Sequence, residues 1–191
     1  MRRIVVTEFV SLDGVMEAPG GEPGYKHSGW VARHSGMDWF PYKNDELFAH
    51  DALLYGRKTY DGMAAAWPTR EGDYADRMNA LPKYVASTTL TDPEWNNTTV
   101  LQGDTAEAVR QLKAQEGGDI LIFGSNTLVQ YLREHDLVDE YRLMIFPVVL
   151  GSGMRLFENS EDAKGLKLID SRRFDSGVMV LAYEVDKTPT A

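Results

Sequence analysis

Residues 119–132, DILIFGSNTLVQYL, join an apolar run to a helical pattern through a short turn of small and polar residues. The run Ile120–Phe123 is typical of a buried strand. The turn at residues 124–127, GSNT, leads into a stretch where leucine and valine recur on one side of a predicted helix. A strand that leads directly into a helix is the repeating unit of α/β proteins. Glycine and serine at this point raise the question of whether a ligand lies against the turn.

The composition indicates one globular domain. The chain has 191 residues, of which 43% are apolar and 26% are charged, and this is enough to bury a sizeable core. Its 20 basic and 29 acidic residues give a net charge of −9, which argues against a general nucleic-acid or anionic-membrane binder. Because the sequence has no cysteine, disulfides, thiolate metal sites and cysteine nucleophiles are excluded.

Nothing in the sequence indicates export or membrane insertion. The opening apolar run at residues 4–6 is broken by Thr7 and Glu8, which is unlike a signal peptide. No stretch reaches the ~18 apolar residues of a membrane span. We therefore expect a cytoplasmic protein.

Hydrophobic periodicity predicts strands that alternate with helices over most of the chain. Such an order predicts an α/β fold with a mostly parallel central sheet and helices on both faces. The last two strands have only the turn at residues 175–177 between them, so they should form an antiparallel C-terminal hairpin. We expect one domain over residues 1–186 and a frayed tail at 187–191. The predicted strands are residues 2–10, 52–55, 83–88, 98–101, 120–123, 141–149, 166–174 and 178–185. The predicted helices are residues 44–51, a short helix that follows the turn at 56–59 and ends at about 66, residues 105–115, and the segment after 127.

The segment at residues 14–44 is long, irregular and rich in glycine, proline and aromatic residues. Long loops in compact domains are often functional, and we interpret this one as a folded loop over a pocket. Trp30, Trp39 and Phe48 are candidates to stack on a flat ring. The alternative, equally open for Trp39 and Phe48, is that these rings only fill the core.

Three predicted strands end in small or cationic polar residues: 56–59, GRKT; 87–89, STT; and 124–127, GSNT. In an open α/β sheet, ligands bind beyond the carboxyl ends of the strands, and helix N-termini favour phosphate. Three such ends together suggest a dinucleotide ligand. The alternative is that glycine, serine and threonine serve only as ordinary caps.

Other chemistries lack their signatures. The four histidines have no metal-ligand spacing, no serine lies in a nucleophile elbow, and there is no Walker-type phosphate loop. The nearest match to a Rossmann fingerprint, residues 151–156, GSGMRL, lacks the third glycine, and we interpret it as a turn between strands. We expect no metal. Asp13, Asp38 and Asp45 lie nearest the predicted pocket, although each aspartate alone is as well explained by a turn or cap.

Several segments resemble dihydrofolate reductases. Residues 52–60, ALLYGRKTY, resemble a strand and turn of those enzymes, and residues 85–88, VAST, resemble their next strand and its serine-rich end. Residues 120–128 match their strand with a double-glycine turn, with Ser125 where a second glycine is usual.

Three further segments are similar to one branch of this fold, the reductase domain of the bifunctional riboflavin-biosynthesis deaminase-reductase. They are residues 11–14, SLDG; 137–143, LVDEYRL; and 147–153, PVVLGSG. The resemblance covers nearly all of residues 2–185. It does not include the deaminase half, because the chain has no zinc-deaminase motif.

The resemblance implies a dihydrofolate reductase-like fold that binds NADPH and reduces a small heterocycle, most similarly to 5-amino-6-(5-phosphoribosylamino)uracil reductase. The alternatives are dihydrofolate reductase activity, or a nucleotide-binding protein without catalysis. The implied cofactor residues hold the 2′-phosphate and pyrophosphate, then the ribose phosphate, then the nicotinamide side. They are, in that order, Gly56, Arg57, Lys58 and Thr59; Ser87 and Thr88; and Gly124, Ser125, Asn126, Thr127 and Leu128.

The remaining site residues are candidates for the substrate end. Dihydrofolate reductases place an acid in the helix before their second strand, and Asp38 and Asp45 are the candidates for that catalytic role here. Asp13, Trp30, Trp39 and Phe48 are the candidates to bind substrate.

The C-terminal strands predict a homodimer. The strand at residues 141–149 is apolar on both faces, and the late hairpin adds further β surface. An exposed apolar edge promotes aggregation unless it is covered. The resemblance implies that related domains pair through this region, whereas the alternative is that the chain's own end shields the edge.

Overall fold

The computed structural model describes residues 1–157 and 163–187. It divides into two compact units that interleave along the chain. Unit 1 contains residues 1–6 and 41–138, and unit 2 contains residues 7–40 together with the chain from 139 onward. Strand β1, Ile4–Ser11, contributes to both. The expectation of a single domain stays a prediction, and the predicted frayed tail lies outside the described residues except for Lys187, which pairs with Asp139.

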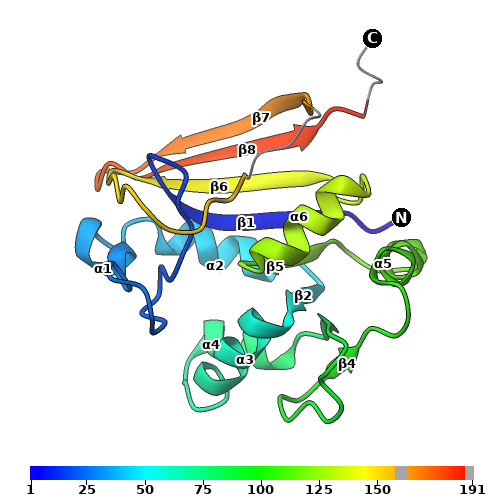
Figure 1. Ribbon diagram of the computed structural model, residues 1–191. Helices are drawn as coiled ribbons and strands as arrows, with labels where there is room; N and C mark the ends of the chain where they lie inside the picture. Colours follow the sequence, from blue (N-terminus) through cyan, green and yellow to red (C-terminus); the bar gives the residue numbers. More distant parts are fainter. Residues whose placement is uncertain (158–162, 188–191) are drawn as a thin grey trace. The chain divides into compact units, whose positions relative to one another are not determined.

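Unit 1 holds the parallel part of the sheet (Figure 1). Its strands lie in the order β4-β3-β2-β5, with the first half of β1 next to β5. Strand β2 is parallel to both β3 and β5, and β3 is parallel to β4. The carboxyl ends of β2, β3 and β5 therefore lie at one edge of this sheet, as the predicted strand order requires. These strands are β2, Ala52–Gly56; β3, Lys83–Ala86; β4, Thr98–Val100; and β5, Ile120–Phe123.

Helices cover this sheet because its strands are apolar on both faces. Leu53, Tyr55 and Leu121 pack with residues of α2, α3 and α4 in one core cluster. The alternating residue Leu54 is also fully buried and points to the opposite face, where α6 contacts β2. The helices are α2, Phe40–Phe48; α3, Arg57–Ala66; α4, Asp73–Ala80; α5, Thr105–Ala114; and α6, Asn126–Glu134.

Lys83, at the start of β3, is fully buried and ties this strand to the end of α4. Its Nζ donates to the carbonyl oxygens of Asn79 and Leu81, each at 2.8 Å, and of Asn96 at 3.2 Å. Burial lowers the pKa of Lys83 to about 8. A cation at the C-terminal end of a helix satisfies carbonyls that have no partner within the helix.

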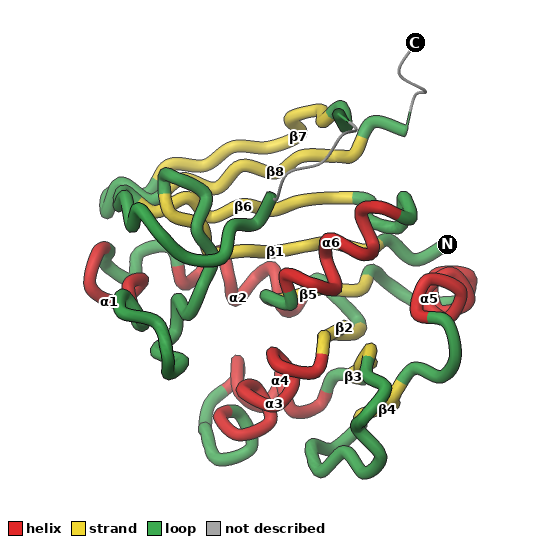
Figure 2. The backbone as a smooth tube through the Cα atoms, viewed as in Figure 1, coloured by secondary structure: helices red, strands yellow, loops and turns green. Residues whose placement is uncertain are grey.

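Unit 2 contains the antiparallel strands of the sheet (Figure 2). The second half of β1 neighbours β6, Glu140–Phe146, and the order continues through β8, Met179–Val185, to β7, Leu166–Arg173, at the edge. Both β6 and β7 pair antiparallel with β8, so the predicted C-terminal hairpin is confirmed. Helix α1, Trp30–His34, lies in the connection that follows β1.

Three of the predicted boundaries that the structure corrects concern residues 14–44, helix α2 and strand β6. The segment at residues 14–44 is not wholly irregular, because it contains α1 and the first part of α2. Helix α2 begins at Phe40, so Asn44 lies inside it and does not cap it. Strand β6 ends at Phe146 rather than at residue 149, because Pro147 has no N–H to continue the ladder.

Helix α4 was not predicted. It begins after Gly72, whose φ is 103°, and no side chain caps its first turn. A sequence search for serine, threonine or asparagine caps therefore has nothing to find at this helix start. Within the described residues, no helix has the length and apolar composition to cross a membrane.

Candidate functional site

The strand-to-helix turns after β2 and β5 lie side by side in unit 1. Leu54 of β2 pairs with Ile122 of β5 in parallel register, and each strand is followed at once by a helix. The Oγ atom of Ser125 accepts a hydrogen bond from Gly56 N at 2.9 Å, and Ser125 N donates to Thr59 Oγ1 at 3.0 Å. These reciprocal bonds lock the two turns together, so the residues of the first and third predicted strand ends form one structure.

The conformation of residues 124 and 125 explains why this turn is small. Gly124 has φ 58° and Ser125 has φ 64°. A Cβ on Gly124 would lie 3.3 Å from both Oγ1 and Cγ2 of Thr59. The turn's own packing therefore accounts for Gly124 before any ligand is considered.

Both helix starts at this junction lack a side-chain cap. Neither Gly56, the N-cap of α3, nor Ser125, the N-cap of α6, makes a side-chain capping bond. Helix α5 shows the usual arrangement, because its N-cap Asp104 accepts from Glu107 N at 2.9 Å. The N-cap side chain therefore does not compete with an anion for the first N–H groups of α3 or α6.

The third predicted strand end, after β3, is a turn closed by its own serine. Ser87 Oγ accepts from Thr89 N at 3.2 Å and from Leu90 N at 3.1 Å. Arg57 reaches this turn from the start of α3, and its Nη1 donates to Thr89 Oγ1 at 3.3 Å. The exposed side chains here include Lys58 and Thr88. On α6, Thr127 is exposed, whereas Asn126 and Leu128 are buried.

A buried ion pair on α2 lies near the end of β5. Lys43 and Glu46 pair with side-chain exposures of only 5% and 1%, and Lys43 Nζ lies 4.9 Å from the centre of the Phe123 ring. Phe123 is the last residue of β5 and directly precedes Gly124. Burial, followed by the charge of Glu46, raises the pKa of Tyr74 well above its usual range.

The catalytic candidate Asp45 lies on this helix beside the buried pair, and its role stays a prediction. Asp45 is exposed, whereas Glu46, one residue later, is buried. The spacing of Lys43 and Glu46 together with Leu47 was the available signal, since these positions share one face of a helix. Hydropathy alone does not detect the burial of Lys43 and Glu46, because charged residues are normally assigned to the solvent face.

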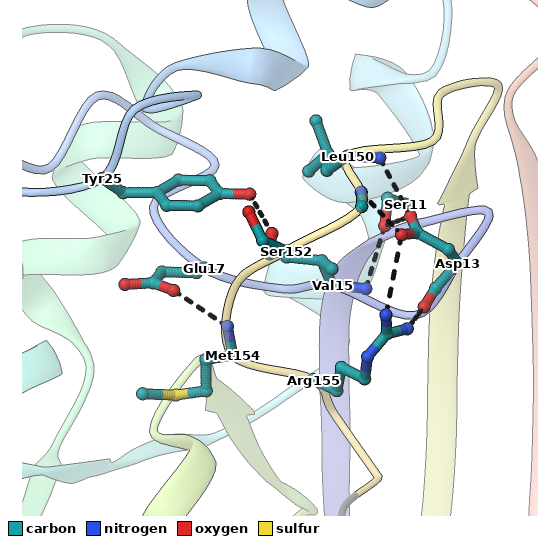
Figure 3. Close-up of polar contacts among 10 residues, drawn as sticks. Ser11, Asp13, Val15, Glu17, Tyr25, Leu150, Ser152, Met154 and Arg155 are labelled. Carbon is teal, nitrogen blue, oxygen red and sulfur yellow. Dashed lines mark hydrogen bonds and ion pairs between the residues drawn. The ribbon is translucent and has the colours of Figure 1, made fainter.

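Asp13 in unit 2 binds the loop that follows β6 (Figure 3). Its carboxylate accepts from Leu150 N at 3.1 Å, from Gly151 N at 2.8 Å and from Ser11 Oγ at 2.7 Å. Arg155 lies 3.8 Å from the same carboxylate and also donates to the Asp13 carbonyl. Burial acts to raise the pKa of Asp13, but these hydrogen bonds outweigh it and hold the pKa at about 2.

Two further contacts join the same segments. Glu17 accepts from Met154 N at 2.8 Å, and the Tyr25 hydroxyl donates to the Ser152 carbonyl at 2.5 Å (Figure 3). A Cβ on Gly153 would lie 2.8 Å from Val15 Cγ1. Residues 150–155 thus form a turn fixed by the segment after β1, and we refer to these contacts as the Asp13 clasp.

The predicted substrate-stacking residues have different surroundings. Trp30 and Trp39 are buried, and each makes edge-to-face contact with Phe146 at 5.3 and 5.8 Å. Their burial favours the core-filling interpretation. Phe48 is exposed, with the Arg77 guanidinium 5.7 Å from its ring. Asp38 is exposed and accepts from Ser176 N at 2.9 Å, and hydrogen bonding by Ser176 lowers its pKa.

No group of three or more histidine or acidic side chains suited to a metal ion occurs within residues 1–157 and 163–187. The features of unit 1 that could bind or react with a ligand are the uncapped starts of α3 and α6, the cations at the start of α3, and the buried ion pair on α2.

The mostly parallel sheet, its covering helices and the antiparallel C-terminal hairpin define a dihydrofolate reductase-like α/β fold. The chain belongs to the RibD C-terminal domain family, whose model matches residues 2–180. It is 32% identical over 187 residues to the uncharacterized protein YyaP of Bacillus subtilis (strain 168), covering 95% of this chain and 94% of that protein. The uncharacterized protein YwjB of the same organism is 26% identical, covering 94% of this chain and 96% of that protein.

Solved structures share the fold at low identity. A putative riboflavin biosynthesis protein from Shewanella sp. PV-4 has a TM-score of 0.75 at 21% identity and covers 97% of this chain and 99% of its own. A pyrimidine reductase-like protein from Corynebacterium diphtheriae has a TM-score of 0.61 at 13% identity, with coverages of 98% and 93%. RibD from Acinetobacter baumannii has a TM-score of 0.64 at 16% identity, and the match covers 97% of this chain but 58% of that protein.

Proposed function

We propose that this chain is an NADPH-dependent reductase of a small heterocycle, of the type that reduces 5-amino-6-(5-phosphoribosylamino)uracil in riboflavin biosynthesis. Membership of the RibD C-terminal domain family supports a reductase-like protein of the riboflavin pathway. The observation that carries the cofactor proposal is the junction of α3 and α6, where two uncapped helix starts meet through Ser125 and Thr59.

The residues at this junction fit a dinucleotide phosphate chemically. The first N–H groups after Gly56 and Ser125 would bind the pyrophosphate. Arg57 and Lys58 would bind the 2′-phosphate, since a guanidinium forms charge-assisted bonds with phosphate oxygens. Ser87 and Thr88 would lie on the ribose-phosphate side, while Gly124 and residues 126–128 would support the nicotinamide side.

The cofactor supplies a hydride, so the protein must supply a proton to the atom next to the reduced carbon. We assign this role to the Lys43–Glu46 pair rather than to Asp38 or Asp45. The Lys43 ammonium donates the proton, Glu46 holds the ammonium in place, and solvent restores the proton afterwards. A buried ion pair is weak evidence for stability, since apolar replacements are often equally stable, and buried titratable groups concentrate at functional sites.

The absorbance of NADPH at about 340 nm provides the activity test, because reduction consumes the cofactor. Consumption with the ribosylaminopyrimidine, and not with dihydrofolate, supports the proposal. Consumption with dihydrofolate alone supports dihydrofolate reductase activity instead. Calorimetric binding of NADPH without turnover of either compound indicates a nucleotide-binding protein, and absence of binding rejects the cofactor site.

We also propose that the protein is a homodimer that pairs through the edge of unit 2. Strand β7 is exposed along its whole length, and Leu166, Leu168 and Ile169 are among its exposed residues. Apolar edge strands are normally covered. Light scattering should give twice the 21.4 kDa chain mass, and Leu168→Lys should shift the protein toward monomer, whereas Lys164→Glu, outside the strand, should not. A wild-type monomer contradicts the proposal.

A further inference from the structure

Arg57 is held by a carboxylate of its own helix. Its Nε donates to both oxygens of Asp61, at 2.8 and 2.9 Å. The two residues are four apart, so they lie on successive turns of α3. Their side chains are 41% and 52% exposed, so the pair is accessible to a dissolved ligand.

Asp61 binds Nε of the guanidinium, whereas Nη1 binds a different residue. Nη1 donates to Thr89 Oγ1 at 3.3 Å, a long contact. Arg57 follows β2 and Thr89 lies beyond β3, and these strands are parallel neighbours with Gly56 paired to Ala86. The guanidinium therefore bridges the carboxyl ends of two adjacent strands, where its Nη edge is available to a phosphate.

Asp61 has two opposite effects on such a phosphate. It orients Arg57, which favours binding, and it places a negative charge beside a dianion, which opposes binding. The orienting effect is small, because an exposed ion pair contributes little. A phosphate with nearly two negative charges that bound the Nη edge of the guanidinium held by Asp61 would lie within the ~8 Å screening length of physiological salt, so screening would only partly remove the repulsion. The repulsion is therefore the larger effect.

We propose that Asp61 determines how strongly this chain prefers NADPH over NADH, by partly neutralising Arg57 at the 2′-phosphate position. This inference depends on the proposed cofactor site. It assigns the preference to the Arg57–Asp61 pair rather than to Arg57 alone. The wild-type protein accordingly discriminates between the two cofactors less than its basic residues suggest.

The test uses two probes that differ only in the 2′-phosphate: adenosine 2′,5′-bisphosphate and adenosine 5′-monophosphate. Asp61→Asn removes the charge but keeps an oxygen that can accept from Nε. It should tighten the bisphosphate about three- to five-fold at low salt and leave the monophosphate unchanged, and the gain should shrink at ~0.5 M salt because screening weakens charge effects.

The matched control is Glu107→Gln on α5. Glu107 is a similarly exposed carboxylate, 57% against 52%, and it pairs with Arg110 at 3.5 Å. Glu107→Gln changes the net charge of the protein by the same amount as Asp61→Asn, but it should leave the affinities for both probes unchanged.

If Asp61→Asn leaves the ratio of the two affinities as in wild type, or lowers it, the inference is wrong while the cofactor site stands. If Glu107→Gln gives the same gain, the effect belongs to net charge and the inference is also wrong. If the wild type binds neither probe, the proposed cofactor site fails and this inference fails with it.

Discussion

The α3–α6 junction in unit 1 and the Asp13 clasp in unit 2 begin from the same kind of sequence and use their polar groups differently. Each follows a strand, and each combines glycine with serine or aspartate. In the clasp, the Asp13 carboxylate is occupied by Leu150 N, Gly151 N and Ser11 Oγ. At the junction, Ser125 locks the turns but caps neither helix start. A helix start that no side chain caps, rather than the small polar residues themselves, therefore distinguishes the candidate binding site from the structural turn.

The largest expected effect separates the buried pair of α2 from its exposed neighbour. Glu46→Leu leaves the buried Lys43 ammonium without this carboxylate, and breaking a buried ion pair costs about 3–5 kcal/mol. Asp45→Asn, on the exposed side of the same helix, should change the free energy of unfolding by less than ~0.5 kcal/mol. Urea denaturation measures both. Equal effects of the two substitutions would remove the reason for preferring Glu46 over Asp45.

Gly124→Val tests the tightness of the junction. A β-branched residue at φ 58° is strained, and its Cβ would lie 3.3 Å from Thr59. We expect a loss of about 2–4 kcal/mol in the free energy of unfolding, in the range of backbone strain combined with overpacking. Gly103→Val is the control: Gly103 has φ 73° and no atom within 4 Å of an added Cβ, so this variant measures the backbone strain without the overpacking. A Gly124→Val protein as stable as wild type contradicts the described turn.

Asp13→Ala tests the clasp. The substitution leaves the N–H groups of Leu150 and Gly151 without their acceptor, which costs about 1–3 kcal/mol in the free energy of unfolding. If the clasp is structural, NADPH affinity should be unchanged by calorimetry. A variant of wild-type stability that has lost only substrate turnover would instead support the predicted role of Asp13 in binding substrate.

The smallest effect is the acid dependence of the clasp. The folded pKa of Asp13, about 2, lies below the usual value near 4, so the unfolded chain binds more protons between these values. Its stabilising contribution is full above about pH 4 and is lost as the pH falls through about 2. Asp13→Asn should flatten this part of the stability curve. An identical acid dependence in Asp13→Asn would show that other carboxylates are responsible.

Local sequence signals predicted the fold well where an element is determined by its own residues. The run Ile120–Phe123 forms a buried strand, and Asp104 caps α5 as its position indicates. The start of α2 was missed because its N-terminal part, with Pro41 following Phe40, lies in a segment with the composition of a loop. Proline is common in the first turn of a helix, and that was the signal available.

The candidate site could be predicted only in part. The Gly124 turn is recognisable because its positive φ of 58° leaves a mark on the sequence. The burial of Lys43 and Glu46 leaves only their helical spacing with Leu47 as a mark, because the burial itself depends on residues distant in the chain, such as Phe123. Asp61 was missed for the opposite reason: a surface carboxylate on a helix is ordinary until its partner Arg57 is seen to reach Thr89.

Calorimetric titration of NADPH and NADH into the wild type and Arg57→Ala tests the central claim most directly. We expect saturable NADPH binding by the wild type. Arg57→Ala should lose about 1.5–3 kcal/mol of NADPH binding, since a charge-assisted bond to the phosphate is removed, while NADH affinity stays the same. A wild type that binds neither cofactor, or an Arg57→Ala protein that binds both as the wild type does, would contradict the claim.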